Sequence, residues 1–315
     1  MPALARSAVA LAVLAVGLAG APCAEAPAGV APGPSLSIER GGAWRSWWRA
    51  GAAPERWRGA DTLVTGALAW HRLADGVEWA SARLAGSAPA WRLRLIVVRI
   101  DPSRVRFSLE LAPASGAGHP AWSVKRAARD AIVAVNTGQF LETMPWGWVV
   151  IDGRERLRPA HGPLATALVV DREGRILWLP ADSVEAGRAE AVTAFESYPT
   201  LLAHDGSVPL PLRMPGFGID LTHRDSRLAI GQSRDGRVLI VMTRFDALGE
   251  AAGSLPVGPT TPEMAAVMGA LGAHDAVMLD GGISAQMSLR ASRGGWHRQW
   301  RGWRSVPLAL LVRSR

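Results

Sequence analysis

The sequence contains almost no cysteine. Cys23 is its single cysteine, and it lies in an N-terminal segment that we expect to be removed. If cleavage falls after it, the mature chain can form no disulfide bond and can offer neither a catalytic thiol nor a thiolate ligand for a metal. This absence excludes disulfide-stapled folds, thiol enzymes and cysteine metal centres.

Lysine is equally scarce. The formal net charge of +8 comes almost entirely from arginine, because Lys125 is the single lysine. The arginines are spread along the chain and are not gathered in one basic block. This spread argues against a nucleic-acid-binding arm and is compatible with an anionic substrate or an anionic envelope surface. We therefore expect no nucleic-acid partner.

The chain has no hydrophobic run long enough to form a stable membrane anchor. The first 26 residues carry one positive charge, Arg6, then a short apolar stretch and small residues around positions 21–26, the layout of a secretory signal. Pro22 directly before Cys23 fits a lipoprotein signal poorly, which favours an ordinary signal peptidase. We predict a signal peptide at residues 1–26 and a periplasmic or secreted mature protein without a stable anchor.

Residues 27–67 precede the main domain and have a different composition. A Pro/Gly/Ala linker is followed by a segment in which tryptophans alternate with arginines. The spacing of Trp44, Trp47 and Trp48 favours an amphipathic helix that packs on its neighbour, ahead of a surface that binds sugars. We predict a linker and a Trp/Arg-rich segment here, ahead of one domain at residues 68–313.

That domain shows many short apolar runs and few helical patterns. With 49% hydrophobic residues the chain can build a large core. One helix is expected at residues 122–130, and another at 262–271, where Thr260 and Glu263 have capping-box spacing. We predict an α+β fold, with mixed, strand-rich sheets flanked by a few helices. The expected strands lie at residues 91–100, 104–111, 131–135, 148–151, 165–170, 175–179, 228–230, 238–242 and 276–279.

The strand at residues 276–279 ends on Asp280, Gly281 and Gly282. Two successive glycines after a buried strand indicate a close approach to the backbone or a very sharp turn. The residues also lie at the C-terminal end of a strand, where open α/β sheets commonly bind ligands. We therefore expect a ligand site at this position.

Four segments together resemble the phosphodiester glycosidase family over roughly residues 68–312. They are AVNTGQF (134–140), PWGWVVIDGR (145–154), SRLAIGQSRDGR (226–237) and PTTPEMAAVMGALGAHDAVMLDGGIS (259–284). The last of these segments is the most specific. An isolated Asp-Gly-Gly would be weak evidence by itself. The resemblance implies a single phosphodiester-glycosidase-like domain that cleaves sugar-1-phosphodiesters. The site residues that it implies are Asn136, Gly138, Arg227, Thr261, Asp280, Gly281, Gly282 and Ser284.

These residue types suit that chemistry. A sugar phosphodiester carries one negative charge, which a guanidinium and backbone N–H groups can bind. Arg227 would supply the guanidinium, and the glycines after Asp280 the N–H groups. Cleavage also needs a base or nucleophile, for which Asp280 is the first candidate. Asn136 and Ser284 would orient substrate hydroxyls or water.

Other interpretations of single residues stay open. His223 is a candidate proton donor near Arg227, although a lone histidine in a loop is more often structural. Asp280 could merely bond the backbone of its own turn. Glu263 is expected to cap its helix and not to act as an acid. We assign no metal and no other cofactor, because Asp220, His223 and Asp225 show no recognised ligand spacing.

Three positions differ from the family pattern: Thr137, Gln139 and Ile283. They flank the expected site residues and leave two hypotheses. The favoured one is an exported hydrolase that cleaves a sugar-1-phosphodiester in envelope or extracellular glycans. The other is a non-catalytic carbohydrate- or phosphoglycan-binding protein on the same fold. The intact Asp280 and Arg227 favour the enzyme.

Overall fold

A computed structural model describes residues 34–87, 92–113, 121–203, 205–247, 253 and 255–315. The predicted signal peptide lies outside the described residues, as does most of the linker. The chain from Gly33 to Arg315 forms one compact unit. Among the described residues no helix is long and apolar enough to cross a membrane.

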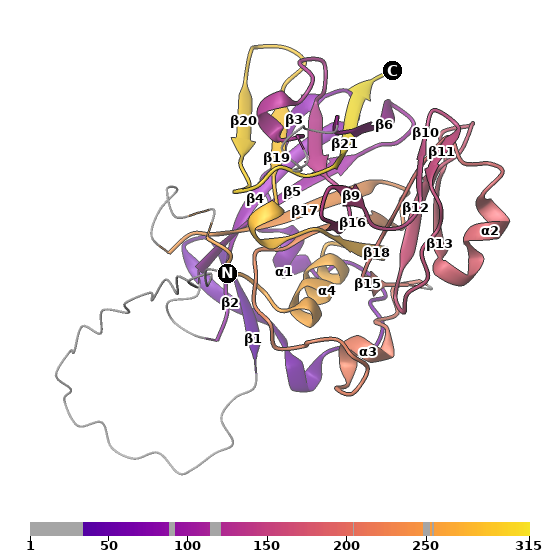
Figure 1. Cartoon of the computed structure of the whole chain (residues 1–315). Helices are drawn as coiled ribbons and strands as arrows, with labels where there is room; N and C mark the ends of the chain where they lie inside the picture. The colour runs from indigo at the N-terminus through magenta and orange to yellow at the C-terminus, as the bar shows by residue number, and fades with distance from the viewer. Residues whose placement is uncertain (1–33, 88–91, 114–120, 204, 248–252, 254) are drawn as a thin grey trace, which may run out of the picture. The chain divides into compact units, whose positions relative to one another are not determined.

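A central antiparallel sheet organises this unit (Figure 1). In the described residues it has nine strands, and its two outermost strands on one side come from the Trp/Arg-rich segment. Their order is β15 (Thr200–Leu202), β18 (Ala273–Leu279), β16 (Leu228–Ser233), β17 (Val238–Phe245), β5 (Arg92–Ile100), β4 (Val77–Ala85), β1 (Ser35–Arg40) and β2 (Ala43–Arg49), with β3 (His71–Ala74) paired to β4.

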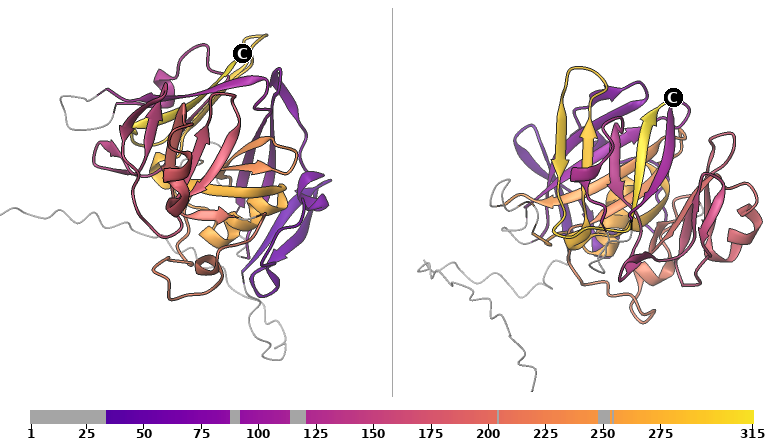
Figure 2. Two further views of the ribbon diagram at one scale, coloured as in Figure 1. Left: turned by 90° about the vertical axis from the view of Figure 1, so that its right-hand side faces the viewer. Right: turned by 45° about the horizontal axis from the view of Figure 1, so that its top comes forward.

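Two smaller antiparallel sheets pack against one face of the central sheet (Figure 2). One has the order β11 (Arg154–Leu157), β10 (Val149–Ile151), β14 (Thr193–Ser197), β12 (Thr166–Val170) and β13 (Ile176–Pro180). The other has the order β20 (His297–Trp300), β19 (Met287–Arg290), β7 (Val133–Asn136), β21 (Leu308–Ser314) and β6 (Val105–Leu111). A short hairpin joins β8 (Phe140–Leu141) to β9 (Met144–Pro145).

The central sheet is buried on both faces, which explains its continuous apolar runs. On β5, Leu95 and Val97 belong to the core beneath the helix α4 (Thr261–Ala270), whereas Ile96 and Val98 belong to the core shared with the two smaller sheets. Successive residues of a strand point to opposite faces, so a strand between two cores must be apolar at nearly every position. The strands predicted from such runs are all present, and the strand-rich α+β fold is confirmed.

Helices are few and short among the described residues. They are α1 (Thr62–Thr65), α2 (Val184–Gly187), α3 (Leu210–Arg213) and α4. Only α4 is long, and it packs on β15 and β18 (Figure 1). Its capping box is confirmed: the Glu263 N–H donates to Thr260 Oγ1 over 3.3 Å, and the Thr260 N–H donates to Glu263 Oε2 over 2.9 Å.

Two predicted helices are wrong. Trp44, Trp47 and Trp48 lie on the strand β2, because pairing with β1 overrides the helix-like spacing. Residues 122–130 form only a 3₁₀ turn, η2 (Val124–Arg126). Trp122 is drawn into a bridge with Val306, so a long-range backbone pair replaces the first turn of the expected helix.

The analogy with open α/β sheets is also wrong, since every strand pair described is antiparallel. Asp280 nevertheless follows directly after the C-terminal end of β18. It lies at the end of the central sheet where β17 ends and β16 begins, because Leu228 pairs with both Leu279 and Met242.

Candidate active site

Asp280 is fixed in place by its backbone. Its N–H donates to the Thr137 carbonyl over 2.9 Å, and its carbonyl accepts from Asn136 Nδ2 over 2.8 Å. The side chain is only 17% exposed. Burial raises the pKa of its carboxyl, hydrogen bonds from Ser284 and Arg304 oppose that rise, and the charge of Asp225 adds to it. Asp280 is therefore a held, partly desolvated carboxyl group.

Asn136 bonds the backbone through both ends of its side-chain amide, and its predicted orientation of substrate hydroxyls stays a prediction. Its side chain is buried, Nδ2 reaches the Asp280 carbonyl, and Oδ1 accepts the Gln286 N–H over 2.9 Å. Both ends of the amide are thus engaged across the loop that carries Asp280. This geometry makes Asn136 a positioning residue for the Asp280 loop.

The two glycines accommodate the neighbouring segment. A Cβ on Gly281 would lie 2.6 Å from the Ser226 carbonyl oxygen. Gly282 has a φ of +55°, and a Cβ there would lie 2.5 Å from Asp225 Oδ2. Close approach and sharp turn therefore both occur. The Gly282 N–H donates to the Ser226 carbonyl over 2.8 Å, so it is not available to a phosphate as we had expected.

Arg304 is the guanidinium that faces Asp280, and we did not predict it from the sequence. Its Nη2 lies 3.4 Å from Asp280 Oδ2, and its Nε donates to Ser284 Oγ over 2.6 Å. The guanidinium stacks on the Phe140 ring at 4.4 Å and is about half exposed. No local motif marks it. The chain brings it here because the Trp303 N–H bonds the Ile283 carbonyl over 2.7 Å.

The Arg227 guanidinium bonds two backbone carbonyls, and its predicted contact with a phosphate stays a prediction. Its Nε donates to the Pro259 carbonyl over 2.8 Å and its Nη2 to the His223 carbonyl over 2.6 Å. Burial lowers its pKa, while Asp225 opposes that shift. The side chain therefore joins the loop before β16 to the loop before α4. Within the described structure, Nη1 is the one nitrogen of this guanidinium that makes no hydrogen bond.

Asp225 is a second carboxylate of the site. From the sequence we considered it only as a metal ligand. Its Oδ1 accepts the Ser226 N–H over 2.8 Å, and its Oδ2 lies 3.7 Å from Nε2 of the exposed His223. Burial raises the pKa of Asp225, and its charge in turn raises that of Asp280. The described residues contain no group of three or more side chains that could hold a metal ion.

The remaining predicted residues make structural contacts around the site. Ser284 is fully buried and bonds Arg304. Thr261 is buried as the first residue of α4. Gly138 permits close packing on β14, because a Cβ there would lie 2.6 Å from the Glu196 carbonyl oxygen. Glu196, which we did not predict, holds the second motif by accepting the Trp148 N–H over 2.9 Å.

The three residues that differ from the family pattern have different surroundings in the structure. Thr137 donates its hydroxyl to the Leu308 carbonyl over 3.3 Å. Gln139 Oε1 accepts from Ser197 Oγ over 3.1 Å and from the Tyr198 N–H over 3.2 Å. Ile283 is 39% exposed beside the carboxylate loop. The first two therefore have structural partners, whereas Ile283 faces outward.

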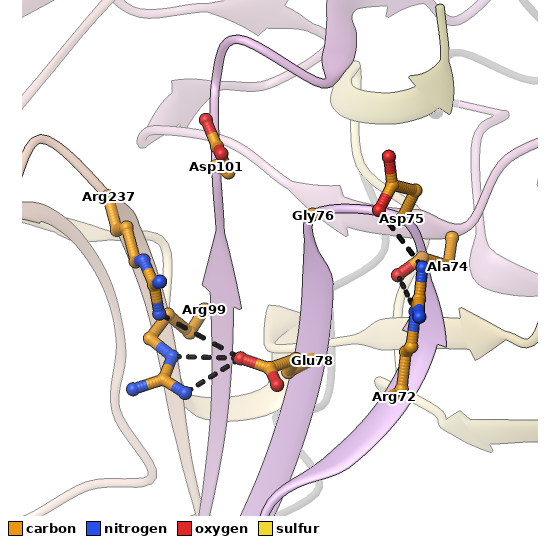
Figure 3. A pocket seen from close by; sticks show the side chains of 8 residues that line it. All are labelled: Arg72, Ala74, Asp75, Gly76, Glu78, Arg99, Asp101 and Arg237. Carbon is orange, nitrogen blue, oxygen red and sulfur yellow. Dashed lines mark hydrogen bonds and ion pairs between the residues drawn. The ribbon is translucent and has the colours of Figure 1, made fainter.

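A polar pocket lies at the end of the central sheet opposite to Asp280 (Figure 3). Arg99 and Arg237 both point at Glu78, with nitrogen–oxygen distances of 2.7 and 3.9 Å (Figure 3). Arg72 pairs with Asp75 at 3.0 Å. Each of these cations meets a carboxylate, which is typical of a structural ion-pair network.

Comparisons with known proteins agree with this fold. The family model for phosphodiester glycosidase matches residues 129–313. The structure resembles the catalytic domain of zebrafish N-acetylglucosamine-1-phosphodiester alpha-N-acetylglucosaminidase with a TM-score of 0.59 and 18% identity, over 82% of this chain and 87% of that one. It also resembles a hypothetical protein from Synechocystis with a TM-score of 0.50 and 15% identity, over 90% of this chain and 68% of that one. No curated protein matches the sequence at a significant level.

Proposed function

The chain belongs to the phosphodiester glycosidase family, and we propose that it is a hydrolase that cleaves the glycosidic bond of a sugar-1-phosphodiester. One observation carries this proposal: the carboxyl of Asp280, whose pKa is raised by burial and by the charge of the second carboxylate Asp225, faces the guanidinium of Arg304 at 3.4 Å. Perturbed carboxyl pairs next to a cation are typical of sites that transfer protons and bind anions.

Asp280 is the base or nucleophile of this mechanism. Arg304 and Ser284 both stabilise its ionised form, which a base or nucleophile requires. As a base, Asp280 would take a proton from water while the water oxygen bonds to the anomeric carbon. The bond from that carbon to the phosphate oxygen breaks, and its electron pair leaves with the phosphate. The products are a reducing sugar and a phosphate monoester.

Asp225 and the cations act on the phosphate side. Asp225 is the candidate acid, with His223 at 3.7 Å as its route to solvent. A phosphate leaving group lessens the need for that proton, so Asp225 should matter less than Asp280. Arg304 is exposed enough to meet the phosphate, and in the described structure the Gly281 N–H has no protein acceptor.

We place the reaction outside the cytoplasm, on envelope or extracellular glycans. The support for this is the signal-like composition of residues 1–26. Mass spectrometry of the protein from its native host should find a mature N-terminus between about residues 21 and 28. An intact Met1 in a cytoplasmic fraction would overturn the proposed location.

The activity is tested by incubating the purified protein with a small panel of sugar-1-phosphodiesters and measuring free reducing sugar. We expect release from at least one diester, and release at least ~100-fold slower from the Asp280→Asn protein. Binding of a diester without release would favour the competing function, a non-catalytic phosphoglycan-binding protein. If the protein neither binds nor cleaves any diester of the panel, both the hydrolase function and the binding function are contradicted.

A further inference from the structure

A second cluster of arginines lies at the same end of the central sheet as Asp280. It borders a cavity of about 250 Å³ whose lining includes Arg94, Arg244, Arg298 and Arg301. Arg244 lies on β17, and Arg94 is its cross-strand partner on β5. None of these residues belongs to the candidate active site described above.

Arg244 is the unusual member of this cluster. It is only 4% exposed, and its Nη2 donates to the Arg301 carbonyl over 2.6 Å. Its Nη1 is buried and has no hydrogen-bond partner among the described residues. By contrast, Arg94 is paired with Asp246 at 3.1 Å. A buried guanidinium that lacks a counter-ion is costly, which indicates that an anion completes this position.

The charge of Arg244 persists at neutral pH. Burial lowers its pKa to about 10, and no carboxylate contributes to the shift. Among the described lining residues the one carboxylate, Asp246, is already paired with Arg94, so the charge of Arg244 stays unbalanced beside the cavity. Guanidinium groups bind the oxygens of phosphate or carboxylate with charge-assisted hydrogen bonds.

The pocket is close to the catalytic carboxylate. Leu228 on β16 pairs with Leu279 on β18 and with Met242 on β17. Asp280 directly follows Leu279, and Arg244 comes shortly after Met242, so both residues lie just beyond this row of paired residues. Their strands are separated only by β16, so their backbones lie on the order of 10 Å apart. A short loop links the two sites directly, because Arg244 holds the Arg301 carbonyl and Arg304 reaches Asp280.

We propose that this pocket binds a second anionic group, a phosphate or a carboxylate, carried by the aglycone of the substrate. The inference rests on the proposed function and narrows it: the substrate is a polyanionic glycan chain and not an isolated diester. The polar pocket of Figure 3 offers the contrast with Arg244, since each of its arginines meets Glu78 or Asp75.

The test measures binding in the Asp280→Asn background, where turnover should not interfere. Two ligands are compared by calorimetry: a sugar-1-phosphate methyl diester, and the same sugar-1-phosphate with an aglycone that ends in a further phosphate. Arg244→Gln and Arg94→Gln are the pocket variants. Arg237→Gln is the control, because it removes one positive charge at the opposite end of the sheet.

We expect the further phosphate to increase affinity about tenfold or more, the range for one charged hydrogen bond. Arg244→Gln should abolish this gain, Arg94→Gln should reduce it, and Arg237→Gln should leave it unchanged. The ratio of the two affinities is decisive, because Arg244→Gln also frees the Arg301 carbonyl and can weaken both ligands alike. If Arg244→Gln does not fold, Arg94→Gln decides.

Equal affinity for the two ligands, or a gain that survives both pocket variants, would overturn the inference. Failure of the protein to bind either diester would instead refute the proposed function. A titration with inorganic phosphate separates the two possible sources of the anion. Phosphate binding that depends on Arg244, without any gain from the further phosphate on the ligand, would show a site for free anion and would also overturn the proposal.

Discussion

The two ends of the central sheet differ in how their charged side chains are paired and buried. At the end shown in Figure 3, Arg99 and Arg237 converge on Glu78, and a hydrogen bond from Ser103 lowers the pKa of Asp101. At the other end, burial raises the pKa of Asp280, and Arg244 is buried with an unpartnered nitrogen. Exposed ion pairs are typical of a structural surface, whereas a desolvated carboxyl group and a buried guanidinium with an unpartnered nitrogen are typical of a place where a ligand binds.

The largest effect should come from Gly282→Val. A β-branched residue at a φ of +55° is strained by about 1–3 kcal/mol, and the new side chain would also meet Asp225 Oδ2. We expect a lower free energy of unfolding together with loss of activity. Chemical denaturation and the reducing-sugar assay check both. A stable variant would show that the turn at Gly282 can relax, and would weaken the claim that the segments at Asp225 and Asp280 are locked together.

Arg304→Gln should have the next largest effect. It removes the charge that faces Asp280 Oδ2 and a candidate contact to the phosphate. Loss of one charged hydrogen bond predicts a fall of about 10- to 100-fold in kcat/KM, with little change in circular dichroism. Unchanged kinetics would return the role of phosphate contact to Arg227.

The pH profile sharpens the same comparison. Because the folded-state pKa of Asp280 is raised, Asp280 loses its ionised form at a higher pH than an ordinary aspartate does. Activity that needs the ionised form should therefore begin to fall, as the pH decreases, above the ordinary range for aspartate. Arg304→Gln removes an influence that lowers this pKa, so its acid limb should shift to higher pH. A shift to lower pH would contradict the assignment of Asp280 as base or nucleophile.

Much of this arrangement was visible in the sequence, because it depends on local patterns. Apolar runs predicted the strands, and the spacing of Thr260 and Glu263 predicted the start of α4. The glycines after Asp280 correctly indicated a crowded turn. These features involve residues a few positions apart, whose geometry the backbone dictates.

Long-range contacts could not be predicted in this way. Arg304 reaches Asp280 only because the loop of Trp303 bonds to Ile283. Arg227 was expected to bind phosphate, but two backbone carbonyls accept from its guanidinium. One arginine resembles another in sequence, and the tertiary structure alone decides which of them keeps free donors.

The smallest effect is expected from Arg237→Gln, at the matched end. Arg237 lies 3.5 Å from Asp235 and 3.9 Å from Glu78, all three side chains are exposed, and Glu78 keeps its closer partner Arg99. Surface pairs of this kind contribute little, so the melting temperature should change by at most about 2 °C and kcat/KM should not change. A clear loss of activity would show that the two ends do not differ in function.

The most direct test compares Asp280→Asn with Asp101→Asn on one cleavable sugar-1-phosphodiester. Both variants are nearly isosteric with the native side chain and remove one carboxylate, but at opposite ends of the central sheet. Circular dichroism should show that both are folded. We predict that Asp280→Asn lowers kcat by at least ~100-fold, whereas Asp101→Asn keeps the rate of the unmodified protein. Equal rates for Asp280→Asn and the unmodified protein would remove Asp280 from the mechanism and contradict the account.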